Sequence, residues 1–250
     1  MNILKSKARL LLVGLVVVFS STSCALQLLR PSGPSATPTP LGDTLSFTMP
    51  AYAVNLDPGD TVPGTRLTYL GKTGDRYQVS IDGMPADKRT GDSFIWNGIL
   101  APGVHASYNL RLTTSLFGSL PVAGPVVVTL FNPNPVERAI PPETSAKMIF
   151  TNIVTSYLIP EGRMVPGTTL RYEGMVIQGE GDQTSKMARL TGVEGYPFLA
   201  LGDSLIWAGE VRENVLARYS LRVAGLNEDG LRLAGTSELW IEPVFEASSP

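Results

Sequence analysis

The sequence contains almost none of the residues that build disulfides and metal centres. Its 250 residues include one cysteine and one histidine, so the chain cannot form an internal disulfide or assemble a zinc site of the usual Cys/His kind. Clustered positive charge is also missing, because 20 Lys and Arg stand against 22 Asp and Glu without a long basic run. Nucleic-acid binding requires such clusters. We therefore expect no metal, no cofactor and no nucleic-acid partner.

The sequence also lacks the pattern of long amphipathic helices. Outside an apolar run near the N-terminus, no stretch of about three turns shows the 3.6-residue hydrophobic period of a helix. The 25 glycines and 20 prolines interrupt the sequence at short intervals. This composition favours many short strands over long helices.

The N-terminus has the order of an export signal over residues 1–23. Lys5, Lys7 and Arg9 precede an apolar run, and small polar residues then lead to Cys24. This end resembles the signal of bacterial lipoproteins, and the resemblance implies a lipid on the Cys24 thiol. The position of the only cysteine supports the same interpretation.

Two other interpretations of the N-terminus remain open. Ordinary cleavage would release a soluble secreted protein. An uncleaved anchor could use residues 10–29, because about 20 residues span a bilayer, although the polar residues at 20–23 disfavour it. Residues 24–43 then place prolines among Ser, Thr and Gly, a composition that predicts an extended tether.

The rest of the chain contains an internal sequence repeat of two copies. The segment 62–71 matches 165–174, and 91–96 matches 202–207, in the same order. Between the copies, residues 132–144 are rich in proline and unsuited to a strand or a helix. An internal duplication therefore predicts a first repeat at 44–140 and a second at 141–247.

Apolar residues alternate within each copy. In 104–112 every second residue is apolar, and 215–223 has the same pattern. A period of two is that of a half-buried strand. With turns at short intervals, it predicts all-β structure, with an antiparallel β-sandwich for each repeat.

The segment 93–104 resembles the penultimate hairpin of Ig-like repeats in bacterial surface proteins. Those repeats often carry Trp-x-Gly-x-Leu-x-Pro-Gly before an alternating strand, and 63–69 is similar to their early strand. The resemblance implies two tandem Ig-like domains that follow the signal peptide and the tether.

A Gly-Asp-Ser-Leu segment at 202–205 matches the signature of a family of serine esterases and lipases. That chemistry needs a general base near the nucleophile, and the only histidine, His105, lies far ahead of Ser204 on the polar side of a predicted strand. The first copy also has Gly-Asp-Ser, ending at Ser93. We therefore interpret both segments as turns that lead to the core residues Trp96 and Trp207.

The remaining site candidates are weaker. The acidic segments 57–60, 180–182 and 227–230 could offer oxygens to Ca²⁺, but turns between strands explain them more simply. Trp240 falls on the opposite side of its predicted strand from Leu239 and Ile241. It is therefore our candidate for ligand contact.

These patterns predict a non-catalytic lipoprotein of the bacterial cell envelope, anchored by Cys24 to membrane lipid and facing the extracytoplasmic side. It would act as an interaction or structural module, with an envelope protein or polysaccharide as its kind of partner. The alternative is a surface protein that binds carbohydrate or a small ligand, and an esterase is disfavoured.

The anchor can be tested directly. Cells that produce the chain and grow with radiolabelled palmitate should incorporate label into it, and Cys24→Ser should remove that label. Equal labelling of the two proteins would show that Cys24 is not the attachment site.

Overall fold

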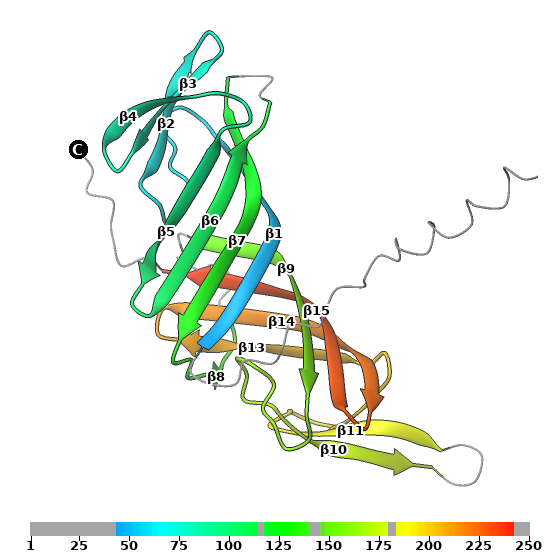
Figure 1. Cartoon of the computed structure of the whole chain (residues 1–250). Coiled ribbons are helices and arrows are strands. Elements are labelled where there is room, and N and C mark those ends of the chain that lie inside the picture. Colours follow the sequence, from blue (N-terminus) through cyan, green and yellow to red (C-terminus); the bar gives the residue numbers. More distant parts are fainter. Residues whose placement is uncertain (1–43, 115–117, 141–145, 147, 180–183, 243–250) are drawn as a thin grey trace, which may run out of the picture. The chain divides into compact units, whose positions relative to one another are not determined.

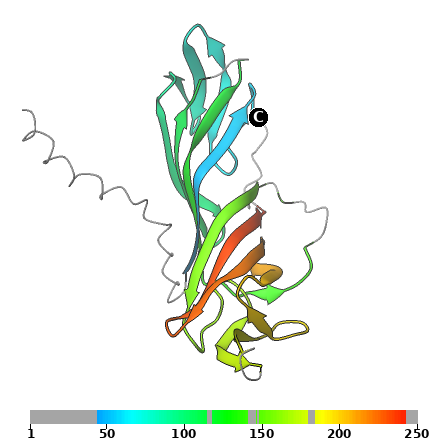
Figure 2. The same ribbon diagram turned by 90° about the vertical axis from the view of Figure 1, so that its right-hand side faces the viewer.

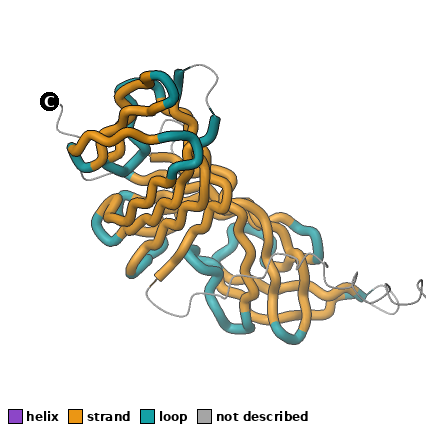
Figure 3. The backbone as a smooth tube through the Cα atoms, turned by 45° about the horizontal axis from the view of Figure 1, so that its top comes forward, coloured by secondary structure: helices purple, strands orange, loops and turns teal. Residues whose placement is uncertain are grey.

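The computed structural model describes residues 44–114, 118–140, 146, 148–179 and 184–242, which form strands and loops without a helix (Figure 3). The predicted all-β class is thus confirmed. A helix that could cross a membrane is not found among these residues. The predicted signal peptide, Cys24 and the tether all lie outside the described ranges.

Seven strands of the first repeat form two antiparallel sheets (Figure 1). The larger sheet has the order β1-β7-β6-β5, and the smaller has the order β2-β3-β4. The strands are β1 (Thr44–Leu56), β2 (Leu67–Thr73), β3 (Arg76–Ile81), β4 (Met84–Lys88), β5 (Ser93–Ala101), β6 (Val104–Leu112) and β7 (Leu120–Phe131).

The second repeat has the same arrangement with one strand added. Its larger sheet has the order β8-β13-β14-β15-β9, and its smaller sheet has the order β10-β11-β12. The strands are β8 (Val136–Glu137), β9 (Met148–Ile159), β10 (Arg171–Gln178), β11 (Ser185–Thr191), β12 (Phe198–Ala200), β13 (Ser204–Arg212), β14 (Val215–Asn227) and β15 (Gly230–Ile241). The order β9-β15-β14-β13 is the same as the order β1-β7-β6-β5 of the first repeat.

The strand order differs from that of an immunoglobulin domain. There the two sheets hold strands A-B-E-D and C-F-G, so that the chain passes from one sheet to the other three times, after strands B, C and E. Here each small sheet holds three consecutive strands, and each large sheet joins the first strand to the last three. The Ig-like part of the prediction is therefore not confirmed.

The alternation in the sequence determines which face of each large sheet is buried. In β6 the apolar residues are at most 2% exposed, and β14 has the same pattern from Val215 to Val223. Their partners on neighbouring strands, such as Val128 and Leu239, are also buried. Each large sheet therefore has an apolar, buried inner face and an outer face that is turned to solvent.

The inner faces of the two repeats contribute to one core. Their buried apolar residues form a single cluster, and the rings of Phe47 and Tyr219 lie 6.2 Å apart across the repeats. Tyr52 and Phe150 lie 5.8 Å apart in the same way. Figures 1 and 2 show the two large sheets side by side, with their strands crossing. The sequence did not indicate this shared core.

Buried tyrosines make the stability sensitive to alkali. Burial raises the pKa of the Tyr157 phenol to about 12, whereas a tyrosine in an unfolded chain loses its proton near pH 10. The free energy of unfolding should therefore fall as the pH rises from about 10 to 12, by about 2–3 kcal/mol for Tyr157.

Between pH 10 and 12, the free energy of unfolding of Tyr157→Phe should fall by about 2–3 kcal/mol less than that of the parent chain. Urea unfolding at a series of pH values would measure the difference. Tyr196→Phe, at a side chain that is 62% exposed, is the control and should follow the parent chain. A pH dependence of Tyr157→Phe equal to that of the parent would contradict the assignment.

Candidate functional site on the outer face of the second large sheet

Both Gly-Asp-Ser segments are turns with the same hydrogen bonds. Gly91 and Gly202 have φ values of 93° and 90°, which suit glycine. The Asp203 carboxylate accepts a 2.8 Å hydrogen bond from the Ala200 amide, and Asp92 accepts one of 2.8 Å from the corresponding amide in the first repeat. These aspartates therefore close turns, as interpreted from the sequence.

The structure places the other esterase candidates on strand surfaces. Ser204 is exposed at the start of β13, and Ser93 is partly exposed at the start of β5. His105 is half-buried on the outer face of β6, beside Ile99 and Thr129 on the neighbouring strands.

The acidic segments also form turns where they are described. Residues 227–230 form the hairpin between β14 and β15, and 57–60 form a turn in which Asp60 accepts a hydrogen bond from the Asp57 amide. The segment 180–182 lies outside the described residues. Within the part of the chain that is described, no three His, Cys, Asp or Glu side chains are grouped to hold a metal ion.

Trp240 lies on the outer face, as its phase predicts, and it belongs to a row that crosses all five strands. The strand register aligns Val136, Glu210, Leu216, Trp240 and Ile149 side by side. Val136 and Ile149 are 54% and 51% exposed, and the three residues between them are partly exposed. Paired residues in antiparallel strands share one face. We call these five residues the outer row.

The equivalent row of the first repeat is mostly polar. The equivalent positions on β5, β6, β7 and β1 are Ile99, His105, Thr129 and Ser46. The hydroxyls of Ser46 and Thr129 are hydrogen-bonded at 3.2 Å. The inner faces of the two repeats therefore match, whereas the outer faces differ.

The connection between the repeats forms one end of the outer row. The Asn134 amide donates a 2.9 Å hydrogen bond to the Val211 carbonyl, and the Arg138 amide donates one of 3.2 Å to the Ala208 carbonyl. The intervening β8 therefore extends the sheet beyond β13. The predicted linker is in part an edge strand.

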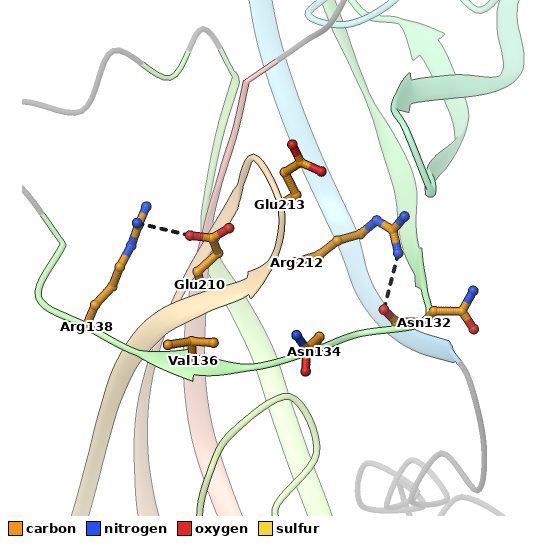
Figure 4. Close-up of a pocket in the computed structure, with 7 residues that line it drawn as sticks. All are labelled: Asn132, Asn134, Val136, Arg138, Glu210, Arg212 and Glu213. Carbon is orange, nitrogen blue, oxygen red and sulfur yellow. Dashed lines mark hydrogen bonds and ion pairs between the residues drawn. The ribbon is translucent and has the colours of Figure 1, made fainter.

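A pocket of about 380 Å³ lies where this connection meets the end of β13 (Figure 4). It is lined by Asn132, Asn134, Val136, Arg138, Glu210, Arg212 and Glu213. Arg138 and Glu210 form a 3.0 Å ion pair, while Glu213 is exposed. The pocket offers amides, carboxylates and guanidinium groups, which suit a ligand with several polar groups.

Arg212 connects the second repeat to the first. Its Nε donates a 2.9 Å hydrogen bond to the Pro102 carbonyl, and its Nη1 donates to the carbonyls of Phe131 and Asn132. These carbonyls lie at the β5–β6 turn and at the end of β7. The guanidinium thus fixes the point where the chain leaves the first repeat.

Sequence reasoning found Trp240 but not the rest of the site. The outer row depends on the strand register, which a sequence does not show. A comparison of the outward positions of the two copies could have found it, because Trp240 and Ile149 replace Thr129 and Ser46. Cys24, the other predicted site residue, lies outside the described residues.

Comparison with known proteins gives no match. No protein-family model matches the sequence, and neither a curated protein nor a solved structure matches the chain.

Arg212→Ala should lower the free energy of unfolding by about 1–2 kcal/mol, because it removes charge-assisted hydrogen bonds to three carbonyls. Chemical denaturation would measure the change. Arg218→Ala, at an exposed arginine of β14, is the matched control and should change stability by less than about 0.5 kcal/mol. Equal effects would show that the Arg212 contacts do not stabilise the fold.

Proposed function

We propose that this protein is a lipoprotein of the bacterial envelope, anchored through Cys24, whose β-sheet unit is a non-catalytic interaction module. The observation that carries the proposal is the outer row, in which four of the five residues on a solvent-facing sheet surface are apolar. In the first repeat, three of the four equivalent residues are His105, Thr129 and Ser46. Because the core is built the same way in both repeats, packing gives no reason for this difference.

The surroundings of the outer row suit a protein partner. Arg218 of β14 and Glu238 of β15 lie opposite each other in the strand register, on the same sheet face as the outer row. The Arg138–Glu210 ion pair lies at the β13 end of the outer row. An apolar centre with a charged rim is the usual composition of a protein interface. Tryptophan is also among the residues that most often dominate binding energy. Trp240 is therefore the expected anchor of the contact.

The sequence of the N-terminus supports the location. The signal-like residues 1–23, Cys24 and the proline-rich residues 24–43 have the order of a lipid anchor followed by a spacer. Such an anchor would hold the outer row on the extracytoplasmic side of a membrane, where an envelope protein could reach it.

The pocket beside β8 favours a second function, the binding of a carbohydrate or another small polar ligand. Its amides and carboxylates could pair with hydroxyl groups, and the partly exposed Trp240 lies in the adjoining outer row. Titration with soluble cell-wall saccharides, followed by amide shifts of Asn132 and Asn134, would test this candidate. Amide shifts confined to other residues, or no shifts at all, would reject the binding of saccharides in this pocket.

Photocrosslinking in the producing bacterium tests the interaction module. Benzoylphenylalanine in place of Ile149, at the exposed end of the outer row, should give an adduct of discrete mass on irradiation. The same residue in place of Ser46, the equivalent position of the first repeat, is the matched control and should give none.

Two further variants make this result specific. Trp240→Ala in the Ile149 photocrosslinking protein should reduce the adduct at least about tenfold, since it removes the expected binding anchor. Cys24→Ser should move the protein out of the membrane fraction. Equal adducts from positions 149 and 46, or no adduct from either, would contradict the proposed surface.

A further inference from the structure

The two repeats differ at one edge of their large sheets. In the second repeat β8 pairs with the edge of β13, and the Arg138 amide extends this pairing by donating a 3.2 Å hydrogen bond to the Ala208 carbonyl. Among the described residues, no strand pairs with the equivalent edge of β5. An uncovered edge presents unpaired N–H and C=O groups, which can pair with an added strand.

The backbone groups that face this edge belong to Asn97 and Ile99. These residues are equivalent to Ala208 and Glu210 of β13, and the Ala208 carbonyl accepts its hydrogen bond from the β8 side. Alternate residues of a strand point their backbone groups to the same side, so the amide of Gly98, between them, faces β6. The edge of β5 can therefore pair with a strand in the register that β8 has on β13.

A glycine keeps this edge accessible to another backbone. In the second repeat the Val136 carbonyl approaches Gly209 so closely that a Cβ there would overlap it. Gly98 has the equivalent position in β5, where a Cβ would overlap the Trp96 ring. Packing on the tryptophan thus requires glycine in both strands, and it leaves no side chain in the way of a carbonyl from an added strand.

In the second repeat β8 also completes the surroundings of a tryptophan. The Trp207 indole donates a 3.0 Å hydrogen bond to the Thr169 hydroxyl, and this hydroxyl donates to the Glu137 carboxylate of β8 at 3.3 Å. Trp207 is 1% exposed, whereas its equivalent in the first repeat, Trp96, is only partly buried. The first repeat has Arg66 in place of Thr169, and a guanidinium cannot accept the indole proton.

Positive charge flanks the open edge. Arg66 is exposed, and no carboxylate among the described residues forms an ion pair with it. Lys88 donates a 3.5 Å hydrogen bond to the Ser93 carbonyl at the start of β5. Pairing of this edge with the same edge of a second copy would bring these positive charges together, which is unfavourable. The charge therefore favours an acidic partner strand.

We propose that the edge of β5 binds an extended acidic segment of a partner protein as an added antiparallel strand. In the register of β8, a carboxylate at the place of Glu137 would pair with Arg66 and accept the Trp96 indole proton. Apolar side chains of the segment would lie beside Ile95 and Ile99, which are 70% and 62% exposed. This surface belongs to the first repeat and is separate from the outer row.

A peptide with the sequence of residues 132–140 is the probe, because it has valine, glutamate and isoleucine at the spacing of this register. At saturating concentration, it should slow amide hydrogen exchange at Asn97 and Ile99 of the full-length chain in detergent micelles at least about tenfold. Exchange at Trp96 and Gly98, whose amides face β6, should not change.

Two methylated peptides separate strand addition from other binding. N-methylation of the valine removes an amide that would donate to β5 and should abolish the slowing. N-methylation of the glutamate, whose nitrogen would face away from β5, is the matched control and should retain it.

Charge reversal tests the acidic character of the partner. Arg66→Glu should raise the Kd of the peptide at least about tenfold, and replacement of the peptide's glutamate by lysine should restore binding to this variant. Arg232→Glu, at an exposed arginine of β15, is the matched control and should bind the peptide like the parent. Trp240→Ala should also leave this binding unchanged, because the outer row is a different surface.

Several results would overturn the proposal. These are the same exchange at Asn97 and Ile99 with and without the peptide, or equal slowing by the two methylated peptides. Slow exchange at both residues before the peptide is added would show that the chain itself covers the edge, or a second copy if the protection grows with protein concentration. Equal Kd values for the parent and Arg66→Glu would overturn the choice of an acidic partner.

Discussion

Neither large sheet can bury its apolar inner face by itself. The two sheets bury these faces against each other, and the rest of the structure depends on this contact. Tyr219 lies at the centre of the contact, with ring neighbours from its own repeat, Tyr157 and Trp207, and one from the other repeat, Phe47. Apolar area removed from water is the main stabilising contribution in a fold of this size. The mutual burial leaves the outer faces and the sheet edges as the places where the two repeats can differ.

Local pattern predicted much of the fold. The period of two in 104–112 and 215–223 identified the buried face of β6 and β14, and the phase of Trp240 placed it on the opposite face, because alternation is a property of one strand. The same pattern says nothing about what covers the buried face. The shared core, to which Phe47 contributes from one repeat and Tyr219 from the other, therefore could not be derived from it.

Two other features were missed for related reasons. The segment 93–104 does form a hairpin, β5–β6, as its resemblance implies, but a hairpin does not determine which distant strands join its sheet. The prolines at 133 and 135 indicated a linker, although a proline fits an edge strand when its nitrogen faces solvent. Val136 lies directly after them and still pairs with Glu210. The outer row has its end there, so missing β8 also meant missing the site.

The two repeats contact each other reciprocally. A Cβ on Gly64 would meet the Met148 side chain, and a Cβ on Gly167, the equivalent glycine, would meet the side chain of Leu45, the residue equivalent to Met148. Paired contacts of this kind are those of a twofold relation, in which each copy covers the other. Because each outer face is encoded by its own half of the chain, the two outer faces can differ while the shared core stays the same.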